Sequence, residues 1–582
     1  MAIELGEWTL ALNGASLPEK SLIGGKAWSI ARLRALDLPV PPAFVITVKA
    51  CNAYLRDGAI PATLDAEIRV GMAWLEAQAA RQFGGGAKPL LVSVRSGAMI
   101  SMPGMMDTVL NLGINAATEV ALATEAADPE FARDTHRRFL DLYARIVLRA
   151  TLPELAATAA IEDWQRAIFE STDQRVPEDP YVQLLGAIHA VFESWNSRRA
   201  RRYREHHGIA HDLGTAVTVQ AMVFGNLDDR SGTGVLFSRN PLTGDPAPYG
   251  EYLARAQGED VVSGRFTPQP LAALVTAMPE IYTELLAAAA TLERENRDVQ
   301  DIEFTIQQGQ LYLLQTRAAK RAPAAAVRFA CDMVHEGRID QATALSRLSA
   351  EQVRVLLSPR LAADATVHAT TVAQGEAACQ GVGVGVVVMN TDEAERRAQA
   401  GEAVVLARET TSPDDVHGMI LARAVITEQG GATSHAAVVS RALGVPCVVG
   451  CGVGNLAALT GTMVTVDGAS GQVYAGSLPV LAPNERDDPA LCELLSWAAR
   501  VCPITVLDET APVAEVYDLD AVKGGEDATQ LATLLAGRKI AKGGAITSDE
   551  GVRAALQAGV TTIVARHRLP VMLAAIAATR DG

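Results

Sequence analysis

The stretch Gly430-Gly431-Ala432-Thr433-Ser434-His435-Ala436-Ala437-Val438-Val439 places one histidine after a glycine turn and at the start of an apolar segment. We predict that a helix begins there. The first N–H groups of a helix lack intrahelical partners, and the helix dipole favours negative charge beside them. Thr433 or Ser434 can cap this helix and donate a hydrogen bond to a phosphate oxygen. Because neutral imidazole is nucleophilic near pH 7, His435 is a candidate phosphoryl carrier. The alternative is that His435 only caps the helix.

Composition narrows the class of protein. The 582 residues suggest three or four domains, and 49% of them are hydrophobic, so that each domain can form a core. The net charge of −16 argues against a protein that coats nucleic acid and against one that binds an anionic membrane surface. Seven scattered cysteines without a CxxC pair favour a reduced compartment. We see no signal peptide and no apolar run long enough to span a bilayer, and therefore expect a cytoplasmic protein.

Two features near the N-terminus suit a phosphate ligand. Gly24-Gly25-Lys26 joins a turn to a predicted helix, so that Lys26 can reach a phosphate near the helix start. Arg95 ends the buried strand predicted at 90–95. A charge in that position needs a partner, and a bound anion would serve. An ordinary surface lysine is the alternative for Lys26.

A predicted hairpin carries alternating polar residues. Asp301 and Glu303 lie two residues apart and therefore share one face of a strand. Gln315 and Arg317 repeat the spacing after the Gln308-Gly309 turn. Carboxylates and an amide oxygen that face one cleft would make an oxygen-rich site for Mg²⁺ and its phosphates. The alternative is a hairpin that is simply half exposed.

From about residue 8 to 476 the chain resembles the pyruvate phosphate dikinase family. The stretches SMPGMMDT and MVFGN look like the phosphate-using dikinases rather than the water-using phosphoenolpyruvate synthases. The segments that carry the resemblance include LIGGKAWSIARL, LVSVRSGAMISMPGMMDTVLNLG, SWNSRRARRYRE, VQAMVFGN, SGTGVLFSRNPLTG, DIEFTIQQGQLYLLQTRAAKR and ITEQGGATSHAAVVSRALGVPCVVG.

The resemblance implies a multidomain α/β and α+β architecture with an ATP-grasp nucleotide-binding domain and a swivelling phosphohistidine domain. Linkers are predicted at AAKRAPAAA and SLPVLAP, which could act as hinges. The expected division is an ATP-grasp domain at 1–325 with a helical insertion at about 115–212, a helical linker at 326–365, the phosphohistidine domain at 366–478 and a small C-terminal α/β domain of unknown role at 479–582.

The resemblance also implies roles for individual residues. His435 would be the phosphorylated histidine, and Thr433 its hydrogen-bonding neighbour. Glu303 and Gln315 would hold Mg²⁺. The expected ATP contacts are Lys26, Arg95, Asp301, Glu303, Gln315 and Arg317, with Arg239 as a further phosphate contact.

The implied activity is that of an ATP-dependent phosphotransferase of the dikinase type. ATP and inorganic phosphate would give AMP, pyrophosphate and phospho-His435, and an unidentified acceptor would then take the phosphoryl group. The acceptor could be a small molecule or be held on a partner subunit, and an oligomer is possible. The alternative is a non-catalytic nucleotide-binding regulatory or scaffold protein derived from a dikinase.

The resemblance stops after Gly476. The family continues into a phosphoenolpyruvate/pyruvate barrel, and a β/α barrel takes roughly 250 residues. About a hundred residues follow Gly476 here, and we find in them no match to the barrel's functional residues. We therefore expect this chain alone not to carry out the pyruvate half-reaction. Asp508, Glu509 and His567, near predicted strand ends, are candidates for an acceptor site.

Overall fold

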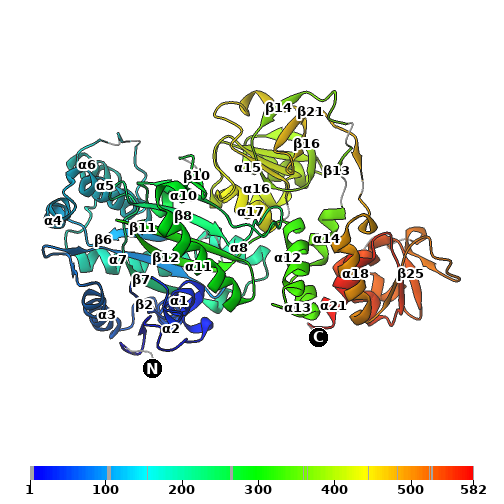
Figure 1. Ribbon diagram of the computed structural model, residues 1–582, viewed down its shortest axis with the longest axis horizontal. Coiled ribbons are helices and arrows are strands. Elements are labelled where there is room, and N and C mark those ends of the chain that lie inside the picture. The colour runs from blue at the N-terminus through cyan, green and yellow to red at the C-terminus, as the bar shows by residue number, and fades with distance from the viewer. Residues whose placement is uncertain are drawn as a thin grey trace.

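The computed structural model describes residues 5–580 except 101, 103–105, 154, 157, 263–265, 358–359, 363–364, 444, 482, 523–524 and 526–527. It confirms the predicted mixed α/β multidomain class, with separate sheets following one another along the chain. In Figure 1 the N-terminal sheets lie at the left, an eight-stranded sheet lies above and to the right, and the C-terminal sheet lies at the lower right. No helix in the described part of the chain is long and apolar enough to cross a membrane.

The first sheet has five antiparallel strands, and two neighbouring strands inside it, β5 and β7, are almost wholly buried. Helices cover it, and several begin with a strong start signal. In α5 and α7 an aspartate caps the first turn and a proline follows it. The strands are, in sheet order, β1 (Thr9–Ala11), β2 (Ala43–Ile46), β7 (Ala216–Ala221), β5 (Val92–Gly97) and β6 (Thr108–Leu112). The helices of this part of the chain are α2 (Val48–Asp57), α3 (Leu64–Ala79), α4 (Ala116–Ala126), α5 (Pro129–Ile146), α6 (Ile161–Thr172), α7 (Pro180–Ser194) and α8 (Arg198–His206).

The second sheet forms the other wall of the N-terminal part and shares an apolar core with helix α1. Its strands are β10 (Gln269–Pro270), β9 (Tyr249–Ala254), β8 (Gly232–Phe237), β11 (Gln300–Gln307) and β12 (Gln310–Ala318). Helices α1 (Lys20–Ala35) and α11 (Pro279–Asn296) pack on it.

The hairpin β11–β12 sets the register of the predicted polar residues. Gln308 and Gly309 both have positive φ, 53° and 72°, as a two-residue turn of the mirror-image type requires. A bulge after Glu303 then shifts the pairing by one residue, so that Glu303 lies opposite Gln315 and Asp301 opposite Arg317. All four side chains therefore start from the same face of the hairpin.

His435 begins a helix that packs on the eight-stranded sheet. Its order is β14-β21-β20-β16-β17-β18-β19-β15, and the run from β16 to β19 is parallel. The strands are β14 (Thr371–Gln374), β15 (Glu376–Cys379), β16 (Val382–Val388), β17 (Val404–Arg408), β18 (Ala424–Thr427), β19 (Cys447–Val449), β20 (Met463–Asp467) and β21 (Gln472–Ala475). Helices α15 (Thr391–Gln399), α16 (Val416–Leu421) and α17 (His435–Leu443) belong to this part of the chain, which we call the histidine domain.

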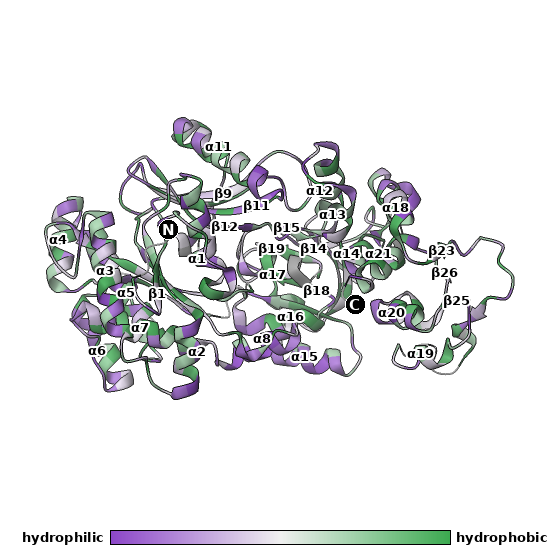
Figure 2. Cartoon of the chain, turned by 90° about the horizontal axis from the view of Figure 1, so that it is seen from below, coloured by the Kyte–Doolittle hydropathy of each residue, from purple (hydrophilic) through white to green (hydrophobic). Residues whose placement is uncertain are grey.

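The C-terminal part is a four-stranded parallel sheet that shares one apolar cluster with the helices after β12. Figure 2 shows the contrast between the mostly apolar helix α21 and the hydrophilic helices α8 and α15. The strands are β23 (Thr505–Leu507), β26 (Thr562–Val564), β25 (Ile540–Lys542) and β24 (Tyr517–Asp518). The helices that share the cluster are α12 (Pro323–His335), α13 (Gln341–Ser346), α14 (Ala350–Leu357), α18 (Pro489–Val501), α19 (Leu531–Leu534), α20 (Asp549–Gln557) and α21 (Arg568–Ala578).

Candidate active site

A cavity of about 490 Å³ in the N-terminal part brings together most of the predicted nucleotide contacts. Five of them line it: Lys26, Arg95, Glu303, Gln315 and Arg317. Asp301 lies behind Arg317, whose Nε donates to the Asp301 carboxylate at 2.7 Å. The residues come from α1, β5 and the hairpin β11–β12, which are far apart in the sequence.

A glycine contact positions Lys26. Gly24 adopts φ 73° inside α1, and a Cβ there would lie 1.7 Å from the carbonyl oxygen of Gly97, so that no other residue fits. The N–H of Gly25 donates to the carbonyl oxygen of Ala98 at 2.9 Å. These two contacts hold the first turn of α1 against the end of β5, and Lys26 and Arg95 therefore face the same cavity.

Burial and neighbouring charges shift the pKa values of two ionisable groups in the cavity, Lys26 and Glu303. Burial, together with the nearby charges of Arg95 and Arg317, lowers the pKa of Lys26 to about 7 against the opposing pull of Glu303. Burial alone would raise the pKa of Glu303, but Arg95, Arg317 and Lys26 outweigh it and hold that pKa below its usual value. Glu303 is therefore a carboxylate near pH 7, bound to Arg95 at 3.4 Å.

The cavity has an oxygen pair that fits a divalent cation. The Oε1 atom of Gln315 is buried and has no hydrogen-bond partner among the described residues. It lies across the hairpin from the ionised Glu303. A buried acceptor without a donor is costly unless a ligand satisfies it. An amide oxygen beside a carboxylate is a donor set suited to Mg²⁺, which completes its shell with phosphate oxygens and waters.

A second cavity, of about 310 Å³, adjoins the first, because Arg95 and Glu303 line both. Its other walls come from the segment 220–223, from Gly234 and Val235 on β8 and from apolar residues of the hairpin, Phe304 and Leu314. Sequence reasoning did not assign this cavity. The signal that could have found it is VQAMVFGN, which carried the family resemblance and supplies one of its walls.

Arg239 does not join the other predicted contacts. Its side chain is only 4% exposed and does not line either cavity. Its guanidinium donates to Glu293 at 2.8 and 3.1 Å and to Glu336 at 2.6 and 2.7 Å. This ion-pair network ties β8 to α11 and α12. The contact of Arg239 with phosphate stays a prediction, while the observed contacts are structural.

We expect Arg239→Met to destabilise the protein rather than to impair nucleotide binding. Removing Arg239 leaves the buried carboxylate of Glu293 with only Arg338, at 3.3 Å, as its cation, so that we expect a cost of up to about 3 kcal/mol. Thermal unfolding should show a lower melting temperature, while the Kd for MgATP, measured by titration calorimetry below that temperature, should stay within about twofold of wild type. A large loss of MgATP affinity in a variant with a normal melting temperature would instead indicate that Arg239 contacts phosphate.

His435 begins helix α17, as predicted, and presents one free ring nitrogen. Its Nδ1 lies 3.1 Å from the hydroxyl oxygen of Thr411. Its Nε2 is buried and has no hydrogen-bond partner among the described residues. Burial lowers the pKa of His435, opposed by the charge of Asp415. In the neutral tautomer whose Nδ1–H donates to Thr411, Nε2 carries an available lone pair.

The turn before His435 contacts the nucleotide-binding part directly. The hydroxyl of Thr433 donates to a carboxylate oxygen of Glu251 on β9. The N–H of Ala432 donates to Glu376 at 3.1 Å, and the hydroxyl of Tyr249 donates to the other oxygen of Glu376 at 3.1 Å. Sequence reasoning missed these contacts, because Glu251 and Thr433 lie 182 residues apart and neither belongs to a local pattern that points to the other.

Apolar contacts reinforce this docking. One buried cluster contains Met102, Trp195 and Ala200 of the nucleotide-binding part together with Ala436 and Ala437 of α17. Met102 also lines the 490 Å³ cavity. The helix that carries His435 therefore shares a packing cluster with a wall of the cavity. The rest of the loop at 101–105 lies outside the described residues.

The candidate acceptor residues of the C-terminal part lie at one edge of its parallel sheet. Asp508 follows β23 and His567 follows β26, and these two strands pair in parallel. The carboxyl edge of a parallel sheet is where ligands bind in open α/β folds. Asp508 is bound to Arg486 at 3.0 Å. An acceptor site here stays a prediction.

Two families of known domains match parts of the chain that contain Lys26, Arg95 and His435. The family described as "Pyruvate phosphate dikinase, AMP/ATP-binding domain" matches residues 20–81 and 59–281. The family described as "PEP-utilising enzyme, mobile domain" matches residues 400–471, which include His435.

Curated relatives agree with these matches. A "Pyruvate, phosphate dikinase" of Rhizobium meliloti (strain 1021) is 41% identical over 538 residues, which cover 84% of this chain and 60% of the relative. One of Clostridium symbiosum is 38% identical over 510 residues, with 81% and 58% covered. The chloroplastic protein of Flaveria pringlei is 41% identical over 523 residues, with 84% and 54% covered.

The chain thus combines an ATP-binding domain with the mobile domain of the enzymes that use phosphoenolpyruvate. It belongs to the pyruvate phosphate dikinase family. It spans 54% to 60% of the length of the three relatives described.

Proposed function

We propose that the chain is an ATP-dependent phosphotransferase of the dikinase type, in which Nε2 of His435 receives the β-phosphoryl group of ATP. One observation carries the proposal. Lys26, Arg95, Glu303, Gln315 and Arg317 meet in one cavity, and the helix that presents the free Nε2 of His435 shares a packing cluster with its wall.

The two adjoining cavities suit the two ends of ATP. The 310 Å³ cavity has apolar walls such as Phe304 and Leu314 and would take the purine ring. The 490 Å³ cavity has Lys26 and Arg317 in its wall and would take the polyphosphate. Arg95 and Glu303 stand at their junction. Glu303 and Gln315 would hold Mg²⁺, which neutralises charge on the phosphates when it is bound.

His435 lines neither cavity, so that the transfer requires the histidine domain to bring Nε2 to the β-phosphorus of the bound ATP. Nε2 of His435 bonds to the β-phosphorus, the bond from that phosphorus to its bridge with the α-phosphate breaks, and AMP leaves with the electron pair. Lys26, Arg95 and Arg317 stabilise the negative charge on the transferring group. Inorganic phosphate then takes the terminal phosphoryl group of the pyrophosphoryl-histidine. Pyrophosphate leaves, and the β-phosphoryl group remains on His435.

The second half of the reaction requires the histidine domain to leave the nucleotide cavity. We propose the domain division 1–325, 326–365, 366–478 and 479–582, with hinges at the linkers that flank the histidine domain. The acceptor is a small molecule or is held on a partner subunit. The C-terminal sheet edge is its candidate site in this chain.

A product assay tests the proposed function. The purified chain is mixed with ATP and Mg²⁺, with and without inorganic phosphate, and the nucleotides are separated by chromatography. We expect AMP in an amount close to that of the protein, because without an acceptor each His435 reacts once. ADP as the product would point to an ordinary kinase or ATPase, and unchanged ATP that is nevertheless bound would favour the regulatory or scaffold alternative.

The pKa of Lys26 predicts that nucleotide binding takes up a proton. With a pKa of about 7, Lys26 is mostly neutral at pH 8, and the polyphosphate raises that pKa when it binds. Uptake should approach one proton near pH 8 and vanish well below pH 7, where Lys26 is already charged. Calorimetric titration in buffers of different ionisation enthalpy measures it, with Lys26→Met to subtract the contribution of the nucleotide. Equal uptake in wild type and Lys26→Met would contradict the assignment.

A further inference from the structure

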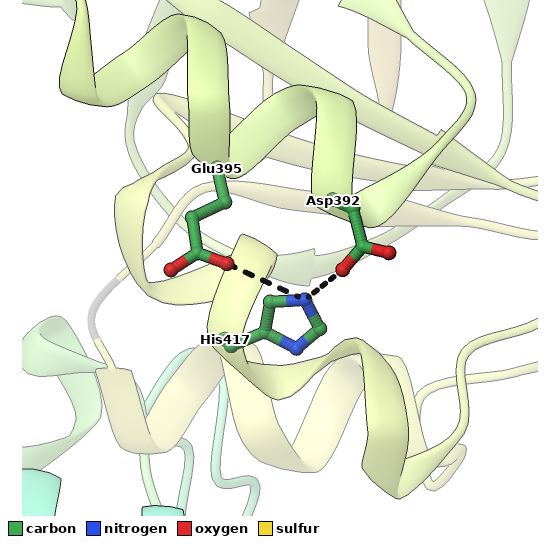
Figure 3. A group of neighbouring side chains, drawn as sticks. All are labelled: Asp392, Glu395 and His417. Atoms are coloured by element: carbon green, nitrogen blue, oxygen red, sulfur yellow. Dashed lines mark hydrogen bonds and ion pairs between the residues drawn. The ribbon is translucent and has the colours of Figure 1, made fainter.

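A cluster of two carboxylates and a histidine lies on the histidine domain, apart from His435 and from the two cavities. It contains Asp392, Glu395 and His417, and one ligand atom of each lies within 4.8 Å of the other two. The Nε2 atom of His417 lies 3.1 Å from Asp392 and 3.7 Å from Glu395. Figure 3 shows this ring nitrogen directed towards both carboxylates.

Local sequence explains why these three residues meet. Asp392 and Glu395 are three residues apart on α15 and therefore share a face of that helix. His417 comes from α16, and Gly418 after it allows a close approach, because a Cβ there would lie 2.4 Å from the methyl group of Thr391. The hydroxyl of Thr391 also bonds to Asp415 at 2.6 Å. Both contacts hold the start of α15 against α16 beside the cluster.

The separations between His417 Nε2 and the two carboxylates match those between ligand atoms around a bound cation. Ligand atoms about 2.0–2.1 Å from Zn²⁺ lie about 3.3 Å apart in a tetrahedral arrangement. The two measured separations, 3.1 and 3.7 Å, fall on either side of that value. An imidazole nitrogen with two carboxylates favours a first-row transition cation over Mg²⁺ or Ca²⁺, which prefer oxygen ligands alone.

The cluster opens onto a groove of about 520 Å³ between the histidine domain and helix α8 of the nucleotide-binding part. His206, the last residue of α8, and His207, which follows it, line this groove together with the three cluster residues. Three arginines of α8 also line the groove, and their charge balances that of its three carboxylates, which are the two of the cluster and Asp414. A cation on three ligands keeps a position for a further ligand, and the imidazoles of His206 and His207 line the same groove from the other domain.

We propose that Asp392, Glu395 and His417 form a binding site for a divalent transition cation such as Zn²⁺, and that the bound cation fastens the histidine domain to α8 through a histidine of that helix. The proposal does not depend on the phosphotransferase activity. It adds a way in which a metal ion, distinct from the Mg²⁺ of the nucleotide, would hold the mobile domain against the nucleotide-binding part.

Calorimetric titration of the full chain with Zn²⁺ in excess Mg²⁺ tests the site. We expect His417→Ala, and separately the double variant Asp392→Asn with Glu395→Gln, to weaken one zinc-binding event at least about tenfold. The matched control is His335→Ala, because His335 also pairs with a carboxylate, Glu493 at 2.8 Å, but belongs to no three-donor group among the described residues. Unchanged zinc binding in both cluster variants, with normal circular dichroism, would overturn the site.

Hydrogen exchange measured by mass spectrometry tests the fastening. Zn²⁺ should slow amide exchange in α8 as well as in α15 and α16, and His417→Ala should lose this protection in all three helices. Replacing both His206 and His207 by glutamine should abolish the protection of α8 alone. Protection confined to α15 and α16 in the wild type would overturn the link between the domains.

Discussion

Replacing His435 by alanine is expected to abolish transfer of phosphorus from ATP to the protein. The transfer needs a nucleophile with an available lone pair, and Nε2 of His435 is buried without a hydrogen-bond partner among the described residues. Alanine removes that atom, so that no residual rate is expected from this site. Incubation with MgATP labelled at the β-phosphorus, followed by alkaline electrophoresis, measures the acid-labile label on the protein.

Two controls make this result specific. His435→Ala should bind MgATP with a Kd within about threefold of wild type, because His435 does not line either cavity. Thr411→Val removes the partner of Nδ1, whose hydroxyl lies 3.1 Å away, and should slow labelling only about fivefold, since one neutral hydrogen bond is worth about 1 kcal/mol. Acid-labile label that persists in His435→Ala would place the carrier on another residue.

Replacing Lys26 by methionine is expected to slow the phosphorylation of His435 by roughly two to three orders of magnitude. The loss is that of one preorganised cation beside the transferring phosphoryl group. Lys26 faces the cavity with Arg95 and Arg317, but it alone combines a compact ammonium with a pKa near 7. Rapid-quench measurement of the label at saturating ATP gives the rate.

The fold should survive this change. Methionine is apolar and close in size to the lysine side chain, and burial already disfavours the charged form of Lys26. The melting temperature should therefore stay equal to that of wild type or rise. Lys49→Met is the matched control, because Lys49 is exposed on α2, and it should label at the wild-type rate. A rate in Lys26→Met within a few-fold of wild type would remove Lys26 from the transfer step.

The hairpin β11–β12 shows which features of the site can be predicted from sequence and which cannot. Asp301 and Glu303 lie two residues apart, as do Gln315 and Arg317, and this spacing predicts that each pair shares one face of its strand. Their alignment across the strands depends on the bulge after Glu303. With the same two-residue turn and no bulge, Glu303 would pair with Leu314, and Gln315 would leave the face of the carboxylates. No residue pattern at that point indicates the bulge.

Contacts between segments that are distant in the sequence also cannot be predicted from local residue patterns. The hydrogen bond from Thr433 to Glu251 and the cluster that joins Met102 to Ala436 depend on how two parts of the chain that are distant in sequence dock. Arg239 shows that a motif does not determine the partner of a buried charge. The family resemblance of its motif predicts a contact with phosphate, whereas in the structure the guanidinium binds the carboxylates of Glu293 and Glu336.

The central claim is that the β-phosphoryl group of ATP passes to His435. Parallel reactions with ATP labelled at the β- or the γ-phosphorus, each with and without inorganic phosphate, test it most directly. We predict that β-label stays on His435 in both conditions, while γ-label appears on the protein only without phosphate and leaves as pyrophosphate when phosphate is added. Gamma-label on His435 that survives the addition of phosphate, with ADP as the product, would contradict the account.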